Sequence, residues 1–369
     1  MRIVITGGAG FIGLNLRRRL EEAGHREIVV LTRDTQPDAL DAALAGADFV
    51  YHLAGVNRPP SPEAFDGVNR GLTEHIAQRL QASGRKVPVV FASSTQAALD
   101  NPYGRSKRAA EQALLRYAEA TGACVSLFRL TNVFGKWARP HYNSAVATFC
   151  HQVARGEPPS VHDPASPLAL VYVDDVVSAF LARLGVEDAG GFIEAEPTHH
   201  TTVGEVADVL RSFAASRQTL VTPPVGTGLV RALYATYLTH LRPEQFAYQV
   251  ARHADARGVF VEMLKTPDCG QFSYFTAHPG VTRGEHYHHT KTEKFLVIQG
   301  TARFGFRHVE TAQTHEIVTH GGDGLIVETI PGWTHDIRNE GTDMLIVMLW
   351  ANEIFDRARP DTVAMKVQP

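Results

Sequence analysis

The sequence holds two groups of side chains whose types and spacing could do chemistry. The first is Tyr103 and Lys107, which are four residues apart and therefore lie on one face of a predicted helix. A phenol with a pKa near ~10 transfers protons poorly at neutral pH, so an adjacent ammonium that stabilises the phenolate is a physical requirement. Ser94, after the apolar run 89–93, is placed to hydrogen-bond a substrate oxygen beside Tyr103, with Ser93 as the alternative. We therefore predict a catalytic group of Ser94, Tyr103 and Lys107.

The second group has the residue types of a metal site. His286 and His288 are separated by one residue, so on a strand both imidazoles face the same side. Glu293 adds a carboxylate oxygen, and His335 supplies a third imidazole further along the chain. Three imidazoles and one carboxylate suit zinc, and equally iron, manganese or nickel. We predict that these four residues bind a divalent metal, with zinc as the first choice.

A glycine-rich loop follows the first apolar run of the chain, at residues 6–13. Glycines at such a strand-to-helix turn let the chain turn tightly, approach a pyrophosphate and pack the helix on the strand. This context predicts a dinucleotide-binding loop. The residues of the loop that we assign to the cofactor are Gly7, Gly10, Phe11, Ile12 and Gly13.

The end of the second apolar run, 28–31, bears on the choice of cofactor. Thr32 and Arg33 occupy this position, and a guanidinium there suits the 2′-phosphate of NADP. A register shift of one or two residues would bring Asp34 to the same place and favour NAD. We predict NADPH, bound by Thr32 and Arg33. The residues assigned to the cofactor after the third apolar run are Leu53, Ala54 and Gly55, and Tyr103 and Lys107 complete this set.

The elements that position these groups differ between the two halves of the chain. Up to about residue 175, β-branched runs alternate with amphipathic helices, which indicates a doubly wound parallel sheet of the Rossmann type. From residue 258 the strand-like runs are short and separated by turns, which indicates an all-β barrel or sandwich. A chain of 369 residues is longer than a single hydrophobic core usually serves, so we expect two domains. We place an α/β domain at 1–245 and a β domain at 246–369.

Composition excludes several classes of partner. The formal charge of -3 provides no basic excess to displace phosphate counterions, so we expect no nucleic acid partner. Three isolated cysteines suit a reducing compartment. No signal peptide or apolar run of membrane-spanning length is evident. We expect a cytoplasmic protein with no membrane association.

The motifs of the first half resemble those of the extended short-chain dehydrogenase/reductase family, over about residues 1–240. This resemblance rests on the glycine loop, the Tyr103–Lys107 pair, and the segments at residues 52–55 and 172–175. It implies a nucleotide-sugar substrate. Dehydratases of this family have an acidic pair directly after the catalytic hydroxyl residue, whereas residues 95–97 of this chain include no acidic residue. Epimerases that recycle bound NAD prefer an acidic residue at the end of the second strand, where this chain has Arg33. A reductase is therefore expected.

The spacing of the second group resembles both cupin motifs. Gly280, Gly300, Gly324 and Asn339 stand with the four predicted ligands at the positions of those motifs. The resemblance implies that the β domain is a jelly-roll barrel with the metal inside.

The whole chain resembles bifunctional enzymes of capsular polysaccharide synthesis that join such a reductase to a cupin, with 132–137 and 349–353 among the diagnostic stretches. This resemblance implies a UDP-linked 2-acetamido-2,6-dideoxy-4-ketohexose as substrate. The cupin would epimerise carbon 3, and NADPH would reduce carbon 4 while Tyr103 gives a proton, Lys107 holds the ribose and Ser94 orients the oxygen. The product would be UDP-2-acetamido-2,6-dideoxy-L-talose, on the route to UDP-N-acetyl-L-fucosamine. The resemblance also implies a homodimer.

Residues after the predicted strand 125–130 are candidates for substrate binding, because this fold binds ligands at such strand ends. Their alternative role is that of ordinary loop residues. Two other functions stay open: a reductase whose cupin is a dimerisation or sensing module, and a binding protein that senses cofactor ratio. The candidate substrate residues are Asn132, Lys136, Arg139, Tyr142 and Asn143.

Overall fold

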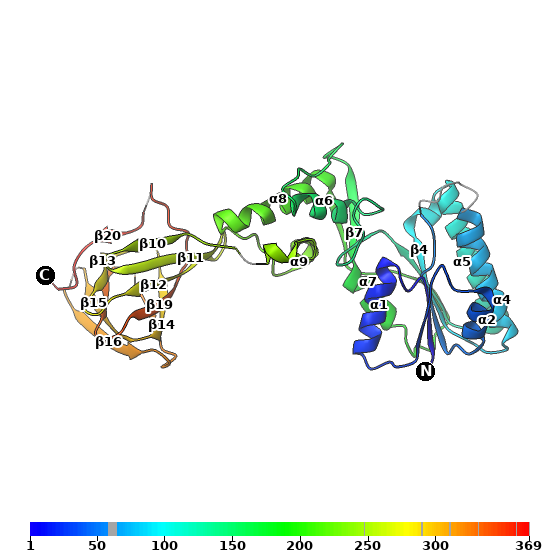
Figure 1. The fold of residues 1–369 in the computed structure, drawn as a ribbon, viewed down its shortest axis with the longest axis horizontal. Coiled ribbons are helices and arrows are strands. Elements are labelled where there is room, and N and C mark those ends of the chain that lie inside the picture. Colours follow the sequence, from blue (N-terminus) through cyan, green and yellow to red (C-terminus); the bar gives the residue numbers. More distant parts are fainter. Residues whose placement is uncertain are drawn as a thin grey trace. The chain divides into compact units, whose positions relative to one another are not determined.

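The chain folds into two compact units (Figure 1). The computed structural model describes residues 1–57, 65–246, 248–288, 291–309, 311–330, 332–358 and 360–368. The first unit comprises Met1–Leu210 and Ala232–Leu241, and the second comprises Arg211–Arg231 and Arg242–Pro369.

The first unit is built on a six-stranded parallel sheet with strand order β2-β1-β3-β4-β5-β8. Its central strands are apolar on both faces, as expected for a parallel sheet covered on both sides. This confirms the Rossmann-like sheet predicted from the alternating pattern. The strands are β1 (Ile3–Thr6), β2 (Ile28–Leu31), β3 (Phe49–His52), β4 (Val89–Ser94), β5 (Val125–Leu130) and β8 (Gly190–Ile193).

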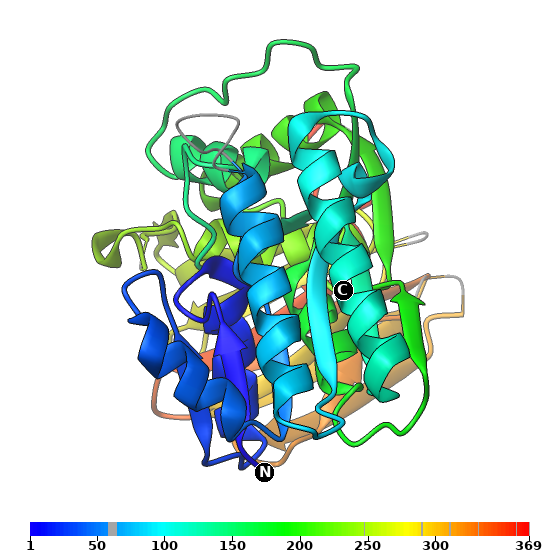
Figure 2. The same ribbon diagram turned by 90° about the vertical axis from the view of Figure 1, so that its right-hand side faces the viewer.

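Helices cover both faces of this sheet, and each face has its own core. Val4 packs with one group of helices, whereas Ile3 and Ile5 pack with the other, because successive side chains of a strand point to opposite faces. Figure 2 views the unit from the side of α2, α4 and α5, which lie in front of the strands. The first group is α2 (Pro37–Ala45), α4 (Leu72–Ala82) and α5 (Pro102–Thr121), and the second is α1 (Phe11–Glu22) and α7 (Val173–Leu181).

A smaller three-stranded sheet and further helices follow the carboxyl end of β5. Strands β6 and β7 are parallel, and β9 joins β7 antiparallel. Throughout the described ranges, every helix is too short or too polar to span a bilayer. These elements are β6 (Asn132–Phe134), β7 (Pro167–Tyr172), β9 (Thr198–Thr202), α6 (Ala145–Val153), α8 (Val203–Thr219), α9 (Gly228–Leu238) and η3 (Pro243–Gln245). Two short helical segments precede β5: η1 (Asp66–Gly71) and η2 (Thr95–Ala98).

The second unit consists mainly of two antiparallel sheets, as the closely spaced strand pattern predicted. Phe275 and Phe295 from one sheet and Phe304 and Ile337 from the other meet in a common core. The first sheet has the order β10-β11-β12-β19-β14-β17, with β10 (Arg252–Asp255), β11 (Gly258–Thr266), β12 (Gly270–Ala277), β14 (Glu293–Gln299), β17 (Ile326–Glu328) and β19 (Leu345–Ala351). The second has the order β16-β15-β18-β13-β20, with β13 (Thr282–Tyr287), β15 (Thr301–His308), β16 (Thr314–His320), β18 (Trp333–Asn339) and β20 (Val363–Ala364).

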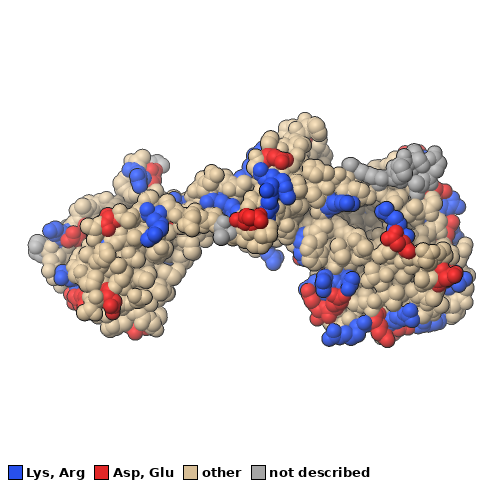
Figure 3. Space-filling model, in the orientation of Figure 1, with Lys and Arg blue, Asp and Glu red and all other residues tan. Residues whose placement is uncertain are grey.

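Both units carry acidic and basic side chains interspersed over the face drawn in Figure 3. This distribution agrees with the small formal charge of -3.

Candidate functional site

The glycine loop between β1 and α1 lies tightly against the loop that follows β3. Gly7 has a φ of 69°, and a Cβ there would lie 2.7 Å from the backbone nitrogen of Ala54. A Cβ at Gly13 would lie 2.5 Å from the Gly7 carbonyl oxygen. Helix α1 begins at Phe11 and has no acidic residue in its first turn. Its first N–H groups therefore offer a binding position for an anion such as a pyrophosphate.

The turn after β2 carries the residues predicted to select the cofactor. β2 ends at Leu31, next to the glycine loop, because Leu31 pairs with Thr6 at the end of β1. The amide of Thr32 donates to Thr35 Oγ1 at 2.9 Å, which fixes the turn. Arg33 and the neighbouring acid, Asp34, are both exposed in it. Arg33 has no ion-pair partner among the described residues, so its guanidinium is free to meet a phosphate.

Tyr103 lies in the first turn of α5, close to the end of β4. Asn101 caps this helix by accepting the Gly104 amide at 2.7 Å, and Pro102 occupies its first position. A Cβ at Gly104 would lie 2.2 Å from the Gln96 carbonyl oxygen, so only glycine lets α5 approach η2 this closely. This approach brings the Tyr103 hydroxyl close to Ser94. Burial raises the pKa of Tyr103, and the interaction with Ser94 opposes that shift.

Lys107, one turn further along α5, is buried with 5% of its surface exposed. Its Nζ donates to the Ala92 carbonyl oxygen at 2.9 Å and lies 4.9 Å from the centroid of the Phe91 ring. Burial lowers the pKa of Lys107 to about 8, although the charge of Glu111 opposes this. A Cβ at Gly55 would lie only 3.1 Å from Nζ. The ammonium thus sits beside the loop after β3 that was assigned to the cofactor.

The geometry favours Ser94 over Ser93 as the partner of Tyr103. Ser93 is buried, and its hydroxyl donates to Glu111 Oε1 at 2.5 Å. Ser94 is at the end of β4 and lies beside Tyr103 instead. The alternation of side chains along the strand separates the two hydroxyls.

The sequence reasoning missed Asn69, which connects the site to its surroundings. Asn69 is 2% exposed, and its Oδ1 accepts the Val56 amide at 2.8 Å. Its Nδ2 donates to the Val56 carbonyl and to Ser106 Oγ, each at 3.0 Å. Asn69 therefore holds the loop after β3 against α5. The available signal was an asparagine shortly before an amphipathic helix, which no motif had singled out.

His52, at the end of β3, has a structural position. Its Nδ1 lies 2.7 Å from Thr6 Oγ1, and its Nε2 lies 2.8 Å from Thr73 Oγ1. Burial, assisted by the charge of Lys107, lowers the pKa of His52 to about 3. The imidazole is therefore neutral and ties β3 to β1 and α4.

The predicted substrate residues lie in and after β6, and they differ in their exposure and in their charge partners. The Nζ of Lys136 is paired with Asp174, so its charge is already balanced. Arg139 is exposed and has no ion-pair partner among the described residues. The Lys136 carbonyl accepts Asn15 Nδ2 at 3.2 Å, which links this loop to α1. The other three are also exposed: Asn132, Tyr142 and Asn143.

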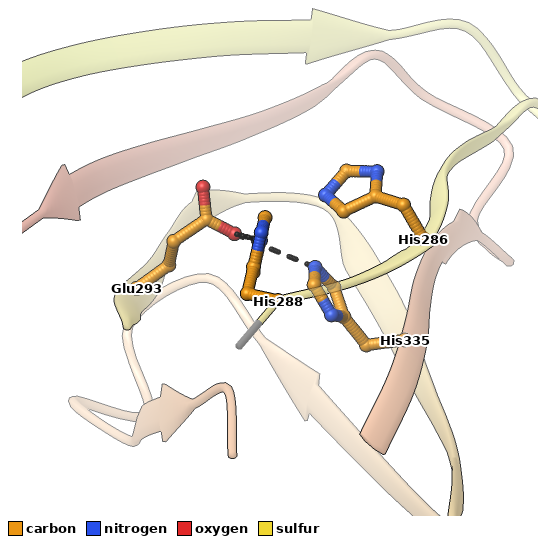
Figure 4. Close-up of side chains that lie close together, drawn as sticks. All are labelled: His286, His288, Glu293 and His335. Carbon is orange, nitrogen blue, oxygen red and sulfur yellow. Dashed lines mark hydrogen bonds and ion pairs between the residues drawn. The ribbon is translucent and has the colours of Figure 1, made fainter. Parts of the chain in front are cut away.

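The four predicted metal ligands converge in the second unit (Figure 4). His286 on β13 is the register partner of His335 on β18, which places the two imidazoles side by side. Oε2 of Glu293 lies 3.2 Å from His288 Nε2 and 3.4 Å from His335 Nε2. One donor atom from each of the four residues lies within 4.8 Å of the others. His288, Glu293 and His335 are buried, and His286 is half-buried.

The groups around this cluster orient its donor atoms. His288 Nδ1 donates to the Asp361 carbonyl, which turns Nε2 toward the cluster. Burial alone would raise the pKa of Glu293, but its contacts with His288 and His335 and the charge of Lys291 hold that pKa well below its usual value. Burial lowers the pKa of His286 to about 4, with His335 contributing.

The donor set fits a divalent cation. An ionised carboxylate and three imidazoles, converging in a largely buried position, are the ligands of such an ion. Within the described part of the chain, the buried Nδ1 of His335 has no hydrogen-bond partner.

Comparison with known proteins places the chain in a family. Residues 3–192 match the NAD dependent epimerase/dehydratase family, and 253–363 match the polysaccharide biosynthesis C-terminal domain. The chain is 52% identical over 368 residues to UDP-2-acetamido-2,6-beta-L-arabino-hexul-4-ose reductase from Pseudomonas aeruginosa, covering 100% of this chain and 99% of that protein. It is 40% identical to the capsular polysaccharide assembling protein CapF from Staphylococcus aureus, with a TM-score of 0.90 and full coverage of both chains. The chain is a CapF-like member of the NAD dependent epimerase/dehydratase family.

The similarity to these two relatives extends over both units, because each alignment covers the whole of this chain. The Thermus thermophilus UDP-glucose 4-epimerase, solved with NAD, is 21% identical and has a TM-score of 0.54. It covers 65% of this chain and 99% of its own, which shows the shared fold of the family.

Proposed function

We propose that this chain reduces the 4-keto group of a UDP-linked 2-acetamido-2,6-dideoxy-4-ketohexose with NADPH. The observation that carries this proposal is the grouping of Tyr103 and Ser94 beside the buried ammonium of Lys107 and near the glycine loop. The full-length similarity to a UDP-sugar 4-ketose reductase supports the substrate class.

The residues of the first unit have distinct roles in this reaction. Bound NADPH supplies the hydride that forms the new C–H bond at carbon 4 of the sugar. The Tyr103 hydroxyl gives its proton to the oxygen that gains negative charge, and solvent later returns a proton to the phenolate. Lys107 stabilises that phenolate and binds the ribose, and Ser94 orients the reacting oxygen. The balance is one hydride and one proton added to one carbonyl.

The choice of NADPH rests on the turn after β2. Its exposed guanidinium, Arg33, suits a 2′-phosphate, and the position of the turn beside the glycine loop is where a ribose would lie. Asp34 lies in the same turn and is the residue that would favour NAD.

We further propose that the second unit is a cupin that epimerises carbon 3 of the same sugar before reduction. A ketone at carbon 4 acidifies the hydrogen on carbon 3, whereas reduction removes that activation and fixes the configuration. The product would be UDP-2-acetamido-2,6-dideoxy-L-talose. His286, His288, Glu293 and His335 would hold a divalent metal, with zinc as the first choice. Such an ion would stabilise an enolate oxygen or shape the pocket.

Proton exchange in deuterated water tests both activities separately. The protein is incubated with the UDP-4-ketosugar, with and without NADPH. We expect deuterium at carbon 3 in both samples and oxidation of NADPH in one. If NADPH is oxidised while carbon 3 keeps its hydrogen, the second unit is a dimerisation or sensing module. If neither change occurs with any UDP-4-ketosugar, the reductase proposal is wrong.

A further inference from the structure

A buried carboxylate lies one helical turn beyond Lys107. Glu111 is on α5 and is 2% exposed. Its Oε1 accepts hydrogen bonds from Ser93 Oγ at 2.5 Å and Arg129 Nε at 3.0 Å. Its Oε2 accepts Arg129 Nη2 at 2.7 Å. The carboxylate is therefore bonded to both β4 and β5 from the helix that carries Tyr103.

The sheet register explains how these groups meet. Ser93 of β4 and Arg129 of β5 are register partners, so their side chains leave the sheet on the same face. That face is the one covered by α5, because Phe91 and Leu127 pack there with Leu114 of the helix. The Arg129 guanidinium also lies 4.4 Å from the centroid of the Phe192 ring.

Three consecutive residues of β4 contact α5. The Ala92 carbonyl accepts a hydrogen bond from Lys107, the Ser93 hydroxyl donates to Glu111, and Ser94 lies beside Tyr103. The outer two of these contacts involve the groups proposed to do the chemistry. The middle contact fixes the backbone between them.

A buried carboxylate is costly unless it is paired and hydrogen-bonded, and an apolar residue of similar size would fill the space at lower cost. Here the bidentate bond from Arg129 satisfies the charge. The presence of a buried ion pair where an apolar residue would cost less free energy indicates that Glu111 has a role in holding the site.

We propose that Glu111 is a positioning residue of the reductase site, which fixes Ser93 and thereby the strand end that presents Ser94 to Tyr103 and the Ala92 carbonyl to Lys107. This inference rests on the reductase function proposed above. Glu111 also supplies a negative charge four residues from Lys107 on the same helix, which favours the protonated ammonium. Among the described residues, the charge of this ammonium also acts on His52 of β3, and Arg129 of β5 is bonded to Glu111. Tyr103 is one turn earlier on the same helix.

Glu111→Gln tests the inference in the full-length protein, through the pH dependence of NADPH oxidation with the UDP-4-ketosugar. We expect kcat to fall by about ten- to a hundredfold, because small displacements of reacting groups cost that much. The alkaline limb of the profile should also move to lower pH, because Lys107 loses its carboxylate neighbour. A purely structural role would not move that limb. The matched control is Glu119→Gln, an exposed glutamate on the same helix, which should leave kcat and the profile unchanged.

Ser93→Ala separates positioning from charge. It removes the hydroxyl that Glu111 holds and leaves the Glu111–Arg129 pair in place. We expect a lower kcat with an unmoved alkaline limb and unchanged NADPH affinity. This small substitution decides the matter if Glu111→Gln fails to fold.

Two outcomes are distinguishable. An active wild-type enzyme whose Glu111→Gln and Ser93→Ala variants keep its kcat and profile would overturn this inference alone. A wild-type protein that oxidises no NADPH with any UDP-4-ketosugar would overturn the proposed function and this inference with it.

Discussion

The first unit, called the α/β unit below, and the second, called the β unit, both bury ionisable groups, but the partners of these groups differ. In the α/β unit, the ammonium of Lys107 has a backbone carbonyl at 2.9 Å and the carboxylate of Glu111 on the same helix, so the protein itself supplies its partners. In the β unit, three imidazoles and Glu293 direct their donor atoms toward one another. The first arrangement is complete without an ion. The second presents lone pairs that a cation would take.

The two groups also differ in how the chain assembles them. Tyr103 and Lys107 come from one helix, and their spacing is a local property. His286, Glu293 and His335 come from three strands, and their meeting depends on the pairing of β13 with β18 and on the packing of two sheets. We therefore expect the reductase group to tolerate changes in the β unit, and the metal cluster to be independent of the cofactor.

The largest effect should follow Tyr103→Phe. Loss of the proton donor should lower the rate of NADPH oxidation by about 10²- to 10⁴-fold, measured from absorbance with the UDP-4-ketosugar. Deuterium exchange at carbon 3 without NADPH should remain, because that reaction is assigned to the other unit. Tyr248→Phe, a half-exposed tyrosine of the β unit, is the control. Loss of both reactions in Tyr103→Phe would remove the division of labour between the units.

His288→Ala should produce the converse pattern. It removes a buried donor, so bound metal and carbon-3 exchange should fall by more than about 100-fold, while reduction of an already epimerised sugar continues. Metal content by elemental analysis and exchange by NMR measure this. His320→Ala, at an exposed position on β16, should change neither. Exchange that persists in metal-free protein would show that the cluster has no part in it.

Arg33→Ala tests whether a single side chain selects the cofactor. The ratio of kcat/KM for NADPH to that for NADH should fall by about tenfold, because a charge-assisted hydrogen bond to the 2′-phosphate is lost. The control is Arg26→Ala, at an exposed position shortly before β2 in the sequence, which should leave the ratio of kcat/KM values unchanged. A wild-type enzyme that prefers NADH would contradict the prediction and favour Asp34 as the selecting residue.

The smallest effect concerns pH. The pKa of Lys107 is about 8, and an ammonium is protonated below its pKa, so kcat should fall by about half between pH 7 and pH 8 and continue to fall above that. Burial raises the pKa of Tyr103, so the phenol stays protonated over this range. Stopped-assay rates at saturating NADPH measure the effect. A flat profile would show that the charge of Lys107 does not limit the reaction.

The residue pattern predicts the framework of both sites. Period and spacing placed Tyr103 and Lys107 on one helix face and the glycines at a strand-to-helix turn, because such rules depend only on neighbouring residues. The same rules put His286 and His288 on one side of a strand. The fold class followed from the change of pattern between the two halves.

Contacts between distant residues were beyond that reasoning. Asn69 and Glu111 had no motif to mark them, yet each bonds elements that are far apart in sequence. The pairing of Lys136 with Asp174 was equally hidden, and it leaves Arg139 as the more available cation.

The sequence by itself determined which residues are candidates for the chemistry and which local elements hold them, because helix and strand periodicity are properties of short segments. Only the tertiary structure decided that Ser94 faces Tyr103 while Ser93 faces Glu111, and that donors from β13 and its end, β14 and β18 meet. The reason is physical: a one-residue step along a strand turns a side chain to the opposite face, and which face meets which helix is set by long-range packing.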